Sequence, residues 1–271
     1  MPMMLDIPPD QTVAIIADTH ANLTALEAVL ADIDAKGIKH IIHLGDVGGK
    51  GPRPREVFES LLERQIPIIY GNWDDLLSRK VQPNFLGDHP LMAEALDYQR
   101  DQIGLELQRT LLTFPYALEL QRFSGVVRLF HASAKGLWVR VRENDPLENF
   151  YGLFESTELI GTDAPMPMAV GYGDIHTTLV RYLRRHPEPM PEMRRKMIFN
   201  VGSVGNPLDE PTPSYGILHG SKGLELTLVR VPYDIELECA AAIKSRMPQL
   251  EEYLQETRTG MYFPRGAPIP T

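Results

Sequence analysis

Aspartate, histidine and asparagine residues recur in this sequence directly after short apolar runs. In chain order they are Asp18, His20, Asp46, Asn72, His131, Asp174 and His176. Carboxylate, imidazole and amide ligands suit Mn, Fe, Zn or Mg, and a single cysteine, Cys239, excludes a thiolate cage. Residues two apart at a strand end point to the same side, so the two members of each D-x-H pair can converge. Together these residues predict a dinuclear metal site.

The elements that must position these residues form a repeated pattern. Apolar runs at 13–17, 40–44 and 66–70 predict buried strands, and helices are expected between them at about 22–36 and 54–64. This β-α-β-α-β order is typical of parallel strands joined by right-handed crossovers. The polar residues then follow the carboxyl ends of the strands, the edge where open α/β sheets bind ligands.

The remaining chain is predicted to complete one domain, residues 1–271. Residues 1–11 are expected to be a loose lead-in, about 75–114 a helical insertion, and about 234–259 C-terminal helices. Between these segments we expect a hairpin at 117–121 and 126–130, a helix at about 147–160 and a strand at 167–173. A second, more antiparallel sheet is expected from the segments 178–183, 197–201, 214–218 and 224–231. A proline-rich turn or flap is expected at 186–195.

Composition limits the function classes. The chain has 271 residues and a net charge of −9, so generic nucleic-acid binding is not expected. No apolar run approaches the length of a membrane helix, and the N-terminus has no basic start or apolar core of a secretory signal. These features predict a cytoplasmic protein without membrane contact, and the sequence leaves open whether it forms a homo-oligomer.

Several motifs resemble those of the calcineurin-like metallophosphoesterases. They are D-T-H-A-N (18–22), L-G-D-V (44–47), G-P-R-P (51–54), G-N-W-D (71–74), F-H-A-S (130–133), G-D-I-H (173–176) and N-V-G-S-V-G (200–205). The closer similarity is to the small prokaryotic branch of phosphodiesterases and asymmetric diadenosine tetraphosphate hydrolases. The resemblance implies a four-layer α-β-β-α sandwich of two mixed sheets, within the α/β class.

The resemblance also implies a ligand set and a reaction. Asp18, His20, Asp46 and His176 would hold one divalent metal, most simply Mn, with Fe, Zn or Mg as alternatives. Asp46 would bridge to a second metal, held also by Asn72, His131 and the position of Asp174. Asp46, Asn72 and His131 would be catalytic, because two cations about 3.5–4 Å apart activate a bridging hydroxide and clamp the phosphoryl oxygens. The expected substrate is a small phosphodiester or a nucleoside polyphosphate.

Asp174 departs from the family pattern, since the usual G-H-x-H reads G-D-I-H here. An aspartate can ligate metal, but it adds a third carboxylate beside Asp18 and Asp46. The site would then attract an anionic phosphate less strongly and would favour harder ions than Zn. Alternatively, the second metal is weak or absent.

Trp73 is a second departure, because the family often has a histidine there that protonates the leaving group. An indole does not titrate, so phosphoanhydrides and aryl esters are favoured over alkyl phosphates. Trp73 could stack on a nucleotide base or could only fill space beneath residues 75–114. Arg53 could contact phosphate or be a solvated loop charge, and Lys135, Arg140 and Arg142 could line the substrate entrance.

Two other functions compete with a metal-dependent phosphoesterase. Asp174 and Trp73 make a catalytically weakened scaffold or regulatory protein of the same fold conceivable. A protein phosphatase has less support, because those enzymes carry an arginine-bearing G-D-x-V-x-R-G segment where this chain reads G-D-V-G-G-K-G.

Overall fold

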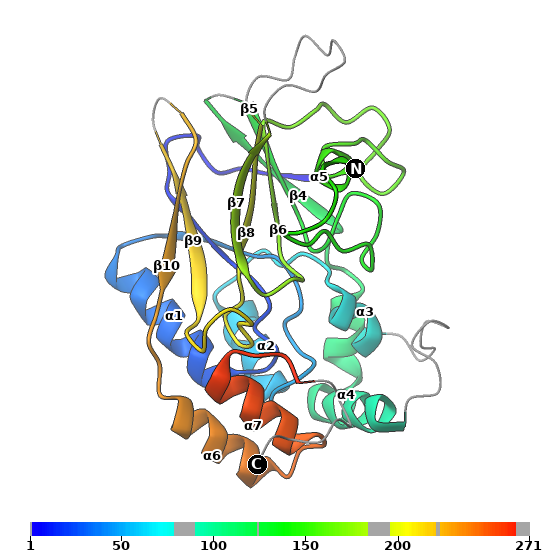
Figure 1. The fold of residues 1–271 in the computed structure, drawn as a ribbon, viewed down its shortest axis with the longest axis vertical. Coiled ribbons are helices and arrows are strands. Elements are labelled where there is room, and N and C mark those ends of the chain that lie inside the picture. The colour runs from blue at the N-terminus through cyan, green and yellow to red at the C-terminus, as the bar shows by residue number, and fades with distance from the viewer. Residues whose placement is uncertain (1, 79–89, 124, 184–195, 221–222, 264–271) are drawn as a thin grey trace.

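The structure is a computed structural model that describes residues 2–78, 90–123, 125–183, 196–220 and 223–263 (Figure 1). The expected turn or flap at 186–195 lies wholly outside these residues, as does the part of the expected helical insertion at 79–89. Among the described residues, no helix is long and apolar enough to span a membrane.

A four-stranded mixed sheet carries the first candidate ligands. Its order is β10 (Glu225–Arg230), β9 (Ser214–His219), β2 (Val13–Ile16) and β3 (His40–His43). The strands β2 and β3 are parallel and joined through the helix α1 (Leu23–Ala35), whereas β9 runs antiparallel to both β2 and β10. Asp18 and Asp46 follow the carboxyl ends of β2 and β3, so the two carboxylates come to one edge of the sheet.

A six-stranded mixed sheet carries the candidate ligands that lie later in the chain. Its order is β1 (Met3–Leu5), β4 (Ala117–Arg122), β5 (Gly125–Phe130), β6 (Ala169–Tyr172), β8 (Lys196–Val201) and β7 (Thr178–Leu183). The strands β5, β6 and β8 are mutually parallel, and β4 and β5 form the expected hairpin. His131 directly follows β5, and Asp174 and His176 follow β6.

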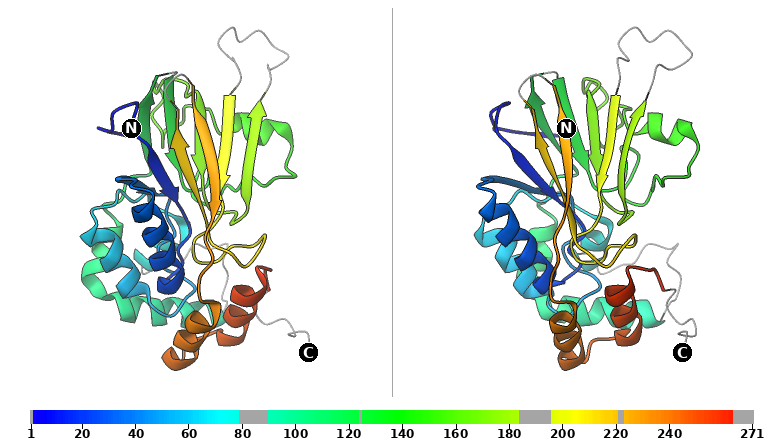
Figure 2. Two further views of the ribbon diagram at one scale, coloured as in Figure 1. Left: turned by 90° about the vertical axis from the view of Figure 1, so that its left-hand side faces the viewer. Right: turned by 60° about the vertical axis from the view of Figure 1, so that its left-hand side comes forward.

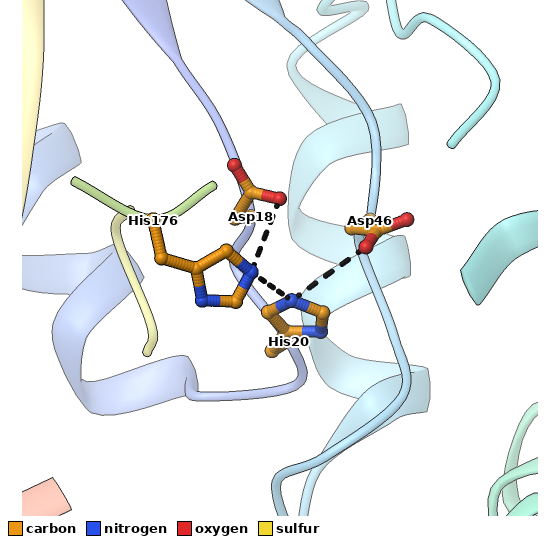
Figure 3. A group of neighbouring side chains, drawn as sticks. All are labelled: Asp18, His20, Asp46 and His176. Atoms are coloured by element: carbon orange, nitrogen blue, oxygen red, sulfur yellow. Dashed lines mark hydrogen bonds and ion pairs between the residues drawn. The ribbon is translucent and has the colours of Figure 1, made fainter. Parts of the chain in front are cut away.

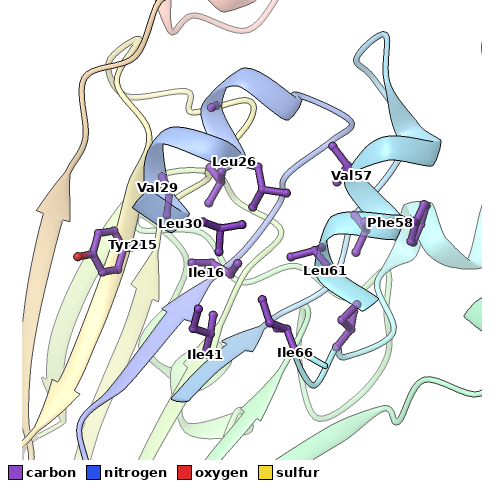
Figure 4. Close-up of a cluster of buried hydrophobic side chains, with 14 of the residues drawn as sticks. Ile16, Leu26, Val29, Leu30, Ile41, Val57, Phe58, Leu61, Ile66 and Tyr215 are labelled. Atoms are coloured by element: carbon purple, nitrogen blue, oxygen red, sulfur yellow. The ribbon is translucent and has the colours of Figure 1, made fainter. Parts of the chain in front are cut away.

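The two sheets pack face to face and helices cover both outer faces, which confirms the predicted α-β-β-α sandwich (Figure 2). Alternation along β2 shows the layers, because successive strand residues point to opposite faces. Val13 and Ile15 join the core between the sheets, whereas Ala14 and Ile16 pack against α1 and α2 (Pro54–Glu63) (Figure 4). On the opposite face, α5 (Leu147–Gly152) contributes Phe150 to a third core.

The remaining helices gather near the site edge of the sandwich (Figure 1). They are α3 (Asn72–Ser78), α4 (Pro90–Leu111), α6 (Ile235–Ser245) and α7 (Leu250–Thr259). The predicted insertion thus contains α4 and most of α3, although α3 begins earlier than expected, at Asn72 itself. The helices α6 and α7 confirm the helical C-terminal segment, and Cys239 is buried where they pack together.

The structure corrects four predictions of secondary structure. Residues 3–5 form a strand, β1, rather than part of a loose lead-in. The predicted third strand at 66–70 is only an isolated bridge between His43 and Ile68, because Pro67 has no N–H to donate to a ladder. The helix expected at 147–160 ends at Gly152, and beyond it Ser156 and Thr157 direct their hydroxyls to backbone carbonyls.

The fourth correction concerns the second sheet. The segments 178–183, 197–201, 214–218 and 224–231 do contain strands, but they do not form one sheet. The first two join the six-stranded sheet as β7 and β8, and the last two join the four-stranded sheet as β9 and β10. The alternation of apolar residues predicted the strands, whereas the choice of sheet depends on long-range pairing that the alternation does not encode.

Candidate metal centre

Four predicted ligands converge in one buried group. The ligand atoms of Asp18, His20, Asp46 and His176 all lie within 4.8 Å of one another (Figure 3). The Nε2 atoms of His20 and His176 are 3.0 Å apart. Asp18 Oδ1 lies 3.5 Å from His176 Nε2, and Asp46 Oδ2 lies 3.7 Å from His20 Nε2.

The hydrogen bonds of the two histidines fix which nitrogen faces the group. His20 Nδ1 donates to the carbonyl of Gly48 at 2.9 Å, and His176 Nδ1 donates to the carbonyl of Asn206 at 2.7 Å. Because a carbonyl can only accept, Nε2 of each neutral ring carries a lone pair. Burial lowers the pKa of His20 and of His176 well below the ordinary value, so both rings stay neutral. Two lone pairs therefore face each other, which a bound cation would satisfy.

A second group adjoins the first across the Asp46 carboxylate. His131 Nε2 lies 3.3 Å from Asp46 Oδ1 and 3.7 Å from Asp174 Oδ1. Asn72 Nδ2 donates to Asp174 Oδ1 at 2.6 Å. His131 Nε2 and Asn72 Oδ1 are buried without a hydrogen-bond partner, although such atoms are normally satisfied. This donor set fits a second hard cation, with the two oxygens of Asp46 directed to different groups.

The backbone carrying these residues is strained. Asp18, His20, Asp46, Asp174 and His176 all have positive φ angles, between 45° and 66°. L-residues rarely adopt this left-handed conformation, and when they do, the residues cluster at functional sites. The turns after β2, β3 and β6 thus hold five of the seven predicted ligands in a costly conformation that the surrounding structure must enforce.

The carboxylates repel one another in this buried space. Burial raises the pKa of Asp18 and of Asp174, and the Asp46 carboxylate raises both further. Although burial favours a neutral His131 ring, the carboxylates of Asp46, Asp18 and Asp174 raise its pKa to about 10. Such a concentration of negative charge attracts cations.

Supporting residues that the sequence did not single out hold the turns in place. Asp74 is fully buried and accepts hydrogen bonds from the backbone N–H groups of Asp46, Val47 and Gly71. Burial and the Asp46 charge raise the pKa of Asp74 to about 7. The only sequence signal for this role is the position of Asp74 in the G-N-W-D motif.

The loop at 200–206 packs against the turn after β2 and supports it. Ser203 Oγ donates to the carbonyl of Asp18 at 2.7 Å, and the N–H of Gly205 donates to the same carbonyl at 3.1 Å. Asn22 caps α1 by accepting from the N–H of Ala25, and its Nδ2 donates to the carbonyl of Gly205. The loop therefore ties the end of β8 to the first ligand-bearing turn.

A cavity of about 1090 Å³ opens over both groups. Its lining includes three of the candidate ligands: Asp46, Asp174 and His176. Positively charged Lys50, Arg140 and Arg142 also line it, together with Trp73 and Trp138. Lys50 and Trp138 were missed by the sequence analysis, because nothing in their local motifs marks them.

Trp73 and Arg53 differ in their relation to this cavity. Trp73 lines it, with its ring edge-on to His20 at a centroid distance of 6.0 Å, and also packs against the apolar core. Arg53 does not line it, because its guanidinium pairs with the buried carboxylate of Glu238 and with the hydroxyl of Thr24. Arg53 therefore lies outside the candidate site. Lys135 is likewise absent from the lining and pairs with Glu155 on the surface.

Comparison with known proteins identifies the family. Residues 12–124 match the family model of the calcineurin-like phosphoesterase superfamily domain. This part of the chain is therefore similar to calcineurin-like phosphoesterase domains. The matched range contains Asp18, His20, Asp46 and Asn72, while His131, Asp174 and His176 lie beyond it.

Similar proteins extend over nearly the whole chain. A metallophosphoesterase of known structure from Sphaerobacter thermophilus has 26% identity and a TM-score of 0.70, covering 93% of this chain and 100% of its own. A hypothetical protein from Pyrococcus horikoshii OT3 shares the fold, with 18% identity and a TM-score of 0.73 over 93% of this chain and 99% of its own. An uncharacterized protein of Methanocaldococcus jannaschii is 27% identical over 244 residues, which cover 88% of this chain and 94% of that protein.

These similarities confirm the predicted family and fold class. The calcineurin-like phosphoesterase domain and the buried Asp/His group are compatible with a divalent metal site.

Proposed function

We propose that this protein is a metal-dependent phosphoesterase that hydrolyses a small phosphodiester or a nucleoside polyphosphate. The observation that carries the proposal is the pair of facing Nε2 lone pairs of His20 and His176 beneath a cavity whose wall includes Lys50, Arg140 and Arg142. An apolar or purely structural site would have no reason to orient two neutral imidazoles in this way.

The residues fit two divalent cations, of which Mn is our first choice. Asp18, His20, Asp46 and His176 would hold one, and Asp46, Asn72, His131 and Asp174 the other. Bound there, such cations would lower the pKa of a coordinated water and neutralise phosphoryl charge. The unpartnered atom Asn72 Oδ1 favours occupancy of the second position, beside a His131 Nε2 atom that faces the carboxylates of Asp46 and Asp174. All seven donors are nitrogen or oxygen atoms, which suits Mn, Fe or Mg.

The cavity lining favours a multiply charged anion. Lys50, Arg140 and Arg142 bring three positive charges to a lining that also contains the carboxylates of Asp46, Glu143 and Asp174. Guanidinium groups bind phosphate oxygens with planar, paired hydrogen bonds, so Arg140 and Arg142 suit a polyphosphate. Trp73 and Trp138 supply aromatic faces on which a base can stack. These features favour a nucleotide over a simple alkyl phosphate.

The residue at position 73 restricts the leaving group. Trp73 offers an N–H that does not titrate near neutral pH, so it cannot protonate an alkoxide. The leaving group must then depart as a stable anion, such as a phosphate or an aryl oxide. Lys50, whose side chain is 9% exposed and lies in the cavity wall, can stabilise that negative charge electrostatically.

A panel of three substrates tests the proposal. Metal-free protein is reconstituted with Mn and assayed on bis-p-nitrophenyl phosphate, p-nitrophenyl phosphate and diadenosine tetraphosphate. We expect turnover of at least one diester or polyphosphate, and we expect Asp46→Asn to abolish it. Asp101→Asn, which neutralises an exposed carboxylate on α4, is the matched control and should retain activity.

The outcomes separate the enzyme from the competing scaffold. Activity that depends on Asp46 and Mn supports the phosphoesterase, and preference for the dinucleotide supports base recognition. Protein that binds Mn but turns over none of the three substrates contradicts the proposed substrate classes. Protein that binds no Mn contradicts the metal-dependent proposal as a whole and favours the scaffold.

A further inference from the structure

The ion pair between Arg140 and Asp174 lies at the border between the second group and the cavity. Arg140 Nε contacts both carboxylate oxygens of Asp174, at 3.0 Å and 2.9 Å. The carboxylate side is almost fully buried, at 1% exposure, whereas the arginine side chain is 38% exposed. The same oxygen, Oδ1, also accepts from Asn72 and lies 3.7 Å from His131 Nε2. Arg140 therefore competes for a carboxylate that belongs to the second candidate cation position.

The outer edge of the guanidinium is available to a ligand. Only Nε of Arg140 takes part in the contact with Asp174, and its two Nη atoms have no hydrogen-bond partner among the described residues. Arg140 lines the cavity together with Arg142 and Lys50. A phosphate group entering the cavity would meet those donors, and charge-assisted hydrogen bonds to phosphate are among the stronger ones in proteins.

The pair also accounts for the charge of the unusual ligand set. With an aspartate at position 174, three carboxylates face two divalent cations, whereas an imidazole there would leave two. Arg140 adds one positive charge beside Asp174. While no second cation is bound, the net charge of the site then equals that of a site with a neutral histidine at position 174. Once a second cation is present, Arg140 and that cation repel each other across one carboxylate.

We propose that Arg140 couples occupancy of the second metal position to binding of substrate phosphate. Without substrate, Arg140 holds Asp174 and weakens the second cation. When a phosphate engages the guanidinium, Asp174 becomes free to serve as a ligand. Binding of phosphate and binding of the second cation then strengthen each other, as thermodynamic linkage requires. This inference rests on the proposed function, because it assumes a phosphorylated substrate and two metal positions.

A purely structural role for Arg140 predicts a different behaviour. If the arginine only fixed the orientation of Asp174, its removal would disorder a ligand and weaken the second cation. However, Asp174 is already held by Asn72 Nδ2 and by its own N–H, which donates to Asp18. Without Arg140, one hydrogen bond still restrains the carboxylate and another restrains the backbone of Asp174, and removal of Arg140 should free the carboxylate for metal.

Calorimetric titration of Mn into metal-free protein, with and without inorganic phosphate, tests the coupling. Without phosphate, we expect Arg140→Gln to bind the second Mn about tenfold more tightly than the wild type, since a competing cation is lost. With phosphate, the wild type should gain more affinity for the second Mn than Arg140→Gln does. Arg140→Lys keeps the charge and should behave more like the wild type.

Arg142→Gln is the matched control, because it removes one positive charge from the same cavity wall without touching Asp174. Its second Mn should bind within about twofold of the wild type. The inference is overturned if Arg140→Gln binds the second Mn more weakly than the wild type, or no differently from Arg142→Gln. Turnover of bis-p-nitrophenyl phosphate, measured in parallel, shows separately whether the proposed function itself fails.

Discussion

Gly205 occupies the point where the loop at 200–206 meets the first ligand-bearing turn, and the substitution Gly205→Ala should disrupt both. A Cβ atom placed on Gly205 would lie 1.7 Å from the carbonyl oxygen of Thr19 and 2.6 Å from its carbonyl carbon. Both atoms belong to the backbone between Asp18 and His20, so no side-chain rotation relieves the clash. The gap must open from 1.7 Å to at least the 3.0 Å that real Cβ contacts keep, a shift of more than an ångström.

The expected cost follows from that displacement. Overpacking of a rigid interior typically costs about 1–3 kcal/mol, and a backbone clash belongs at the upper end of that range. At about 2–4 °C for each kcal/mol, the midpoint of thermal unfolding should fall by about 6–12 °C. A shift of about 1 Å in a catalytic constellation typically costs about a hundredfold in rate, so Mn-dependent turnover should fall by that order.

Gly223→Ala is the matched control for this substitution. A Cβ atom on Gly223 meets nothing within 4 Å, so the midpoint should stay within about 1 °C of the wild type. Thermal unfolding followed by circular dichroism, combined with an assay of Mn-dependent turnover, measures both effects. If Gly205→Ala matched Gly223→Ala in midpoint and in turnover, the loop would not enforce the strained turn.

Three further predictions concern protonation, metal removal and base recognition. Burial lowers the pKa of His43 to about 3, while the unfolded chain takes up its proton near pH 6.5. The folded state therefore loses stability as the pH falls from about 6.5 towards 3. Between pH 7 and 5.5, the free energy of urea unfolding of the metal-free protein should fall by about 1 kcal/mol more in the wild type than in His43→Gln. Mn added to metal-free protein at about 100 times its dissociation constant should raise the free energy of unfolding by about 2.7 kcal/mol per site, and chelation should reverse this; an unchanged unfolding midpoint would contradict it. Trp73→Leu should raise KM for diadenosine tetraphosphate about tenfold, with a smaller change for bis-p-nitrophenyl phosphate, if the indole stacks on a base. Equal losses on both substrates, with a lowered unfolding midpoint, would show instead that Trp73 only fills space.

The ligand set could be predicted from the sequence because each ligand directly follows a strand or a strand-like run. In parallel strands, carboxyl ends meet at one edge, so Asp18, Asp46 and Asn72 had to come together once the first units were recognised. His131 and the residues after β6 joined them because the two sheets face each other with these ends at the same side of the sandwich. Predicting that the seven ligands meet therefore required few assumptions about contacts between distant parts of the chain.

Other parts of the site were not accessible from local sequence. Asp74 stabilises three backbone N–H groups, yet a carboxylate at the start of a helix has many possible roles. Arg140 pairs with a residue far along the chain, and only the folded structure reveals that it contacts Asp174 rather than solvent alone. The same limitation explains Arg53, whose partner Glu238 lies in a C-terminal helix.

The strained turns were also not predictable. Positive φ angles at Asp18, Asp46 and Asp174 are uncommon even for aspartate, which adopts them more often than most residue types, so local patterns alone would not place them there. The surrounding hydrogen bonds, such as those from the 200–206 loop to the Asp18 carbonyl, enforce this geometry. Such conflicts between local preference and global structure are expected where function, rather than stability, selects the residue.

An anomalous difference map from a crystal soaked in Mn would show whether the buried Asp/His group binds metal. We expect one peak flanked by His20 and His176, and a second flanked by His131 and Asn72, with Asp46 between them. The second peak should strengthen when phosphate is present. A map without density at the first position, or with Mn bound only elsewhere on the molecule, would contradict the assignment of this buried group as a metal centre.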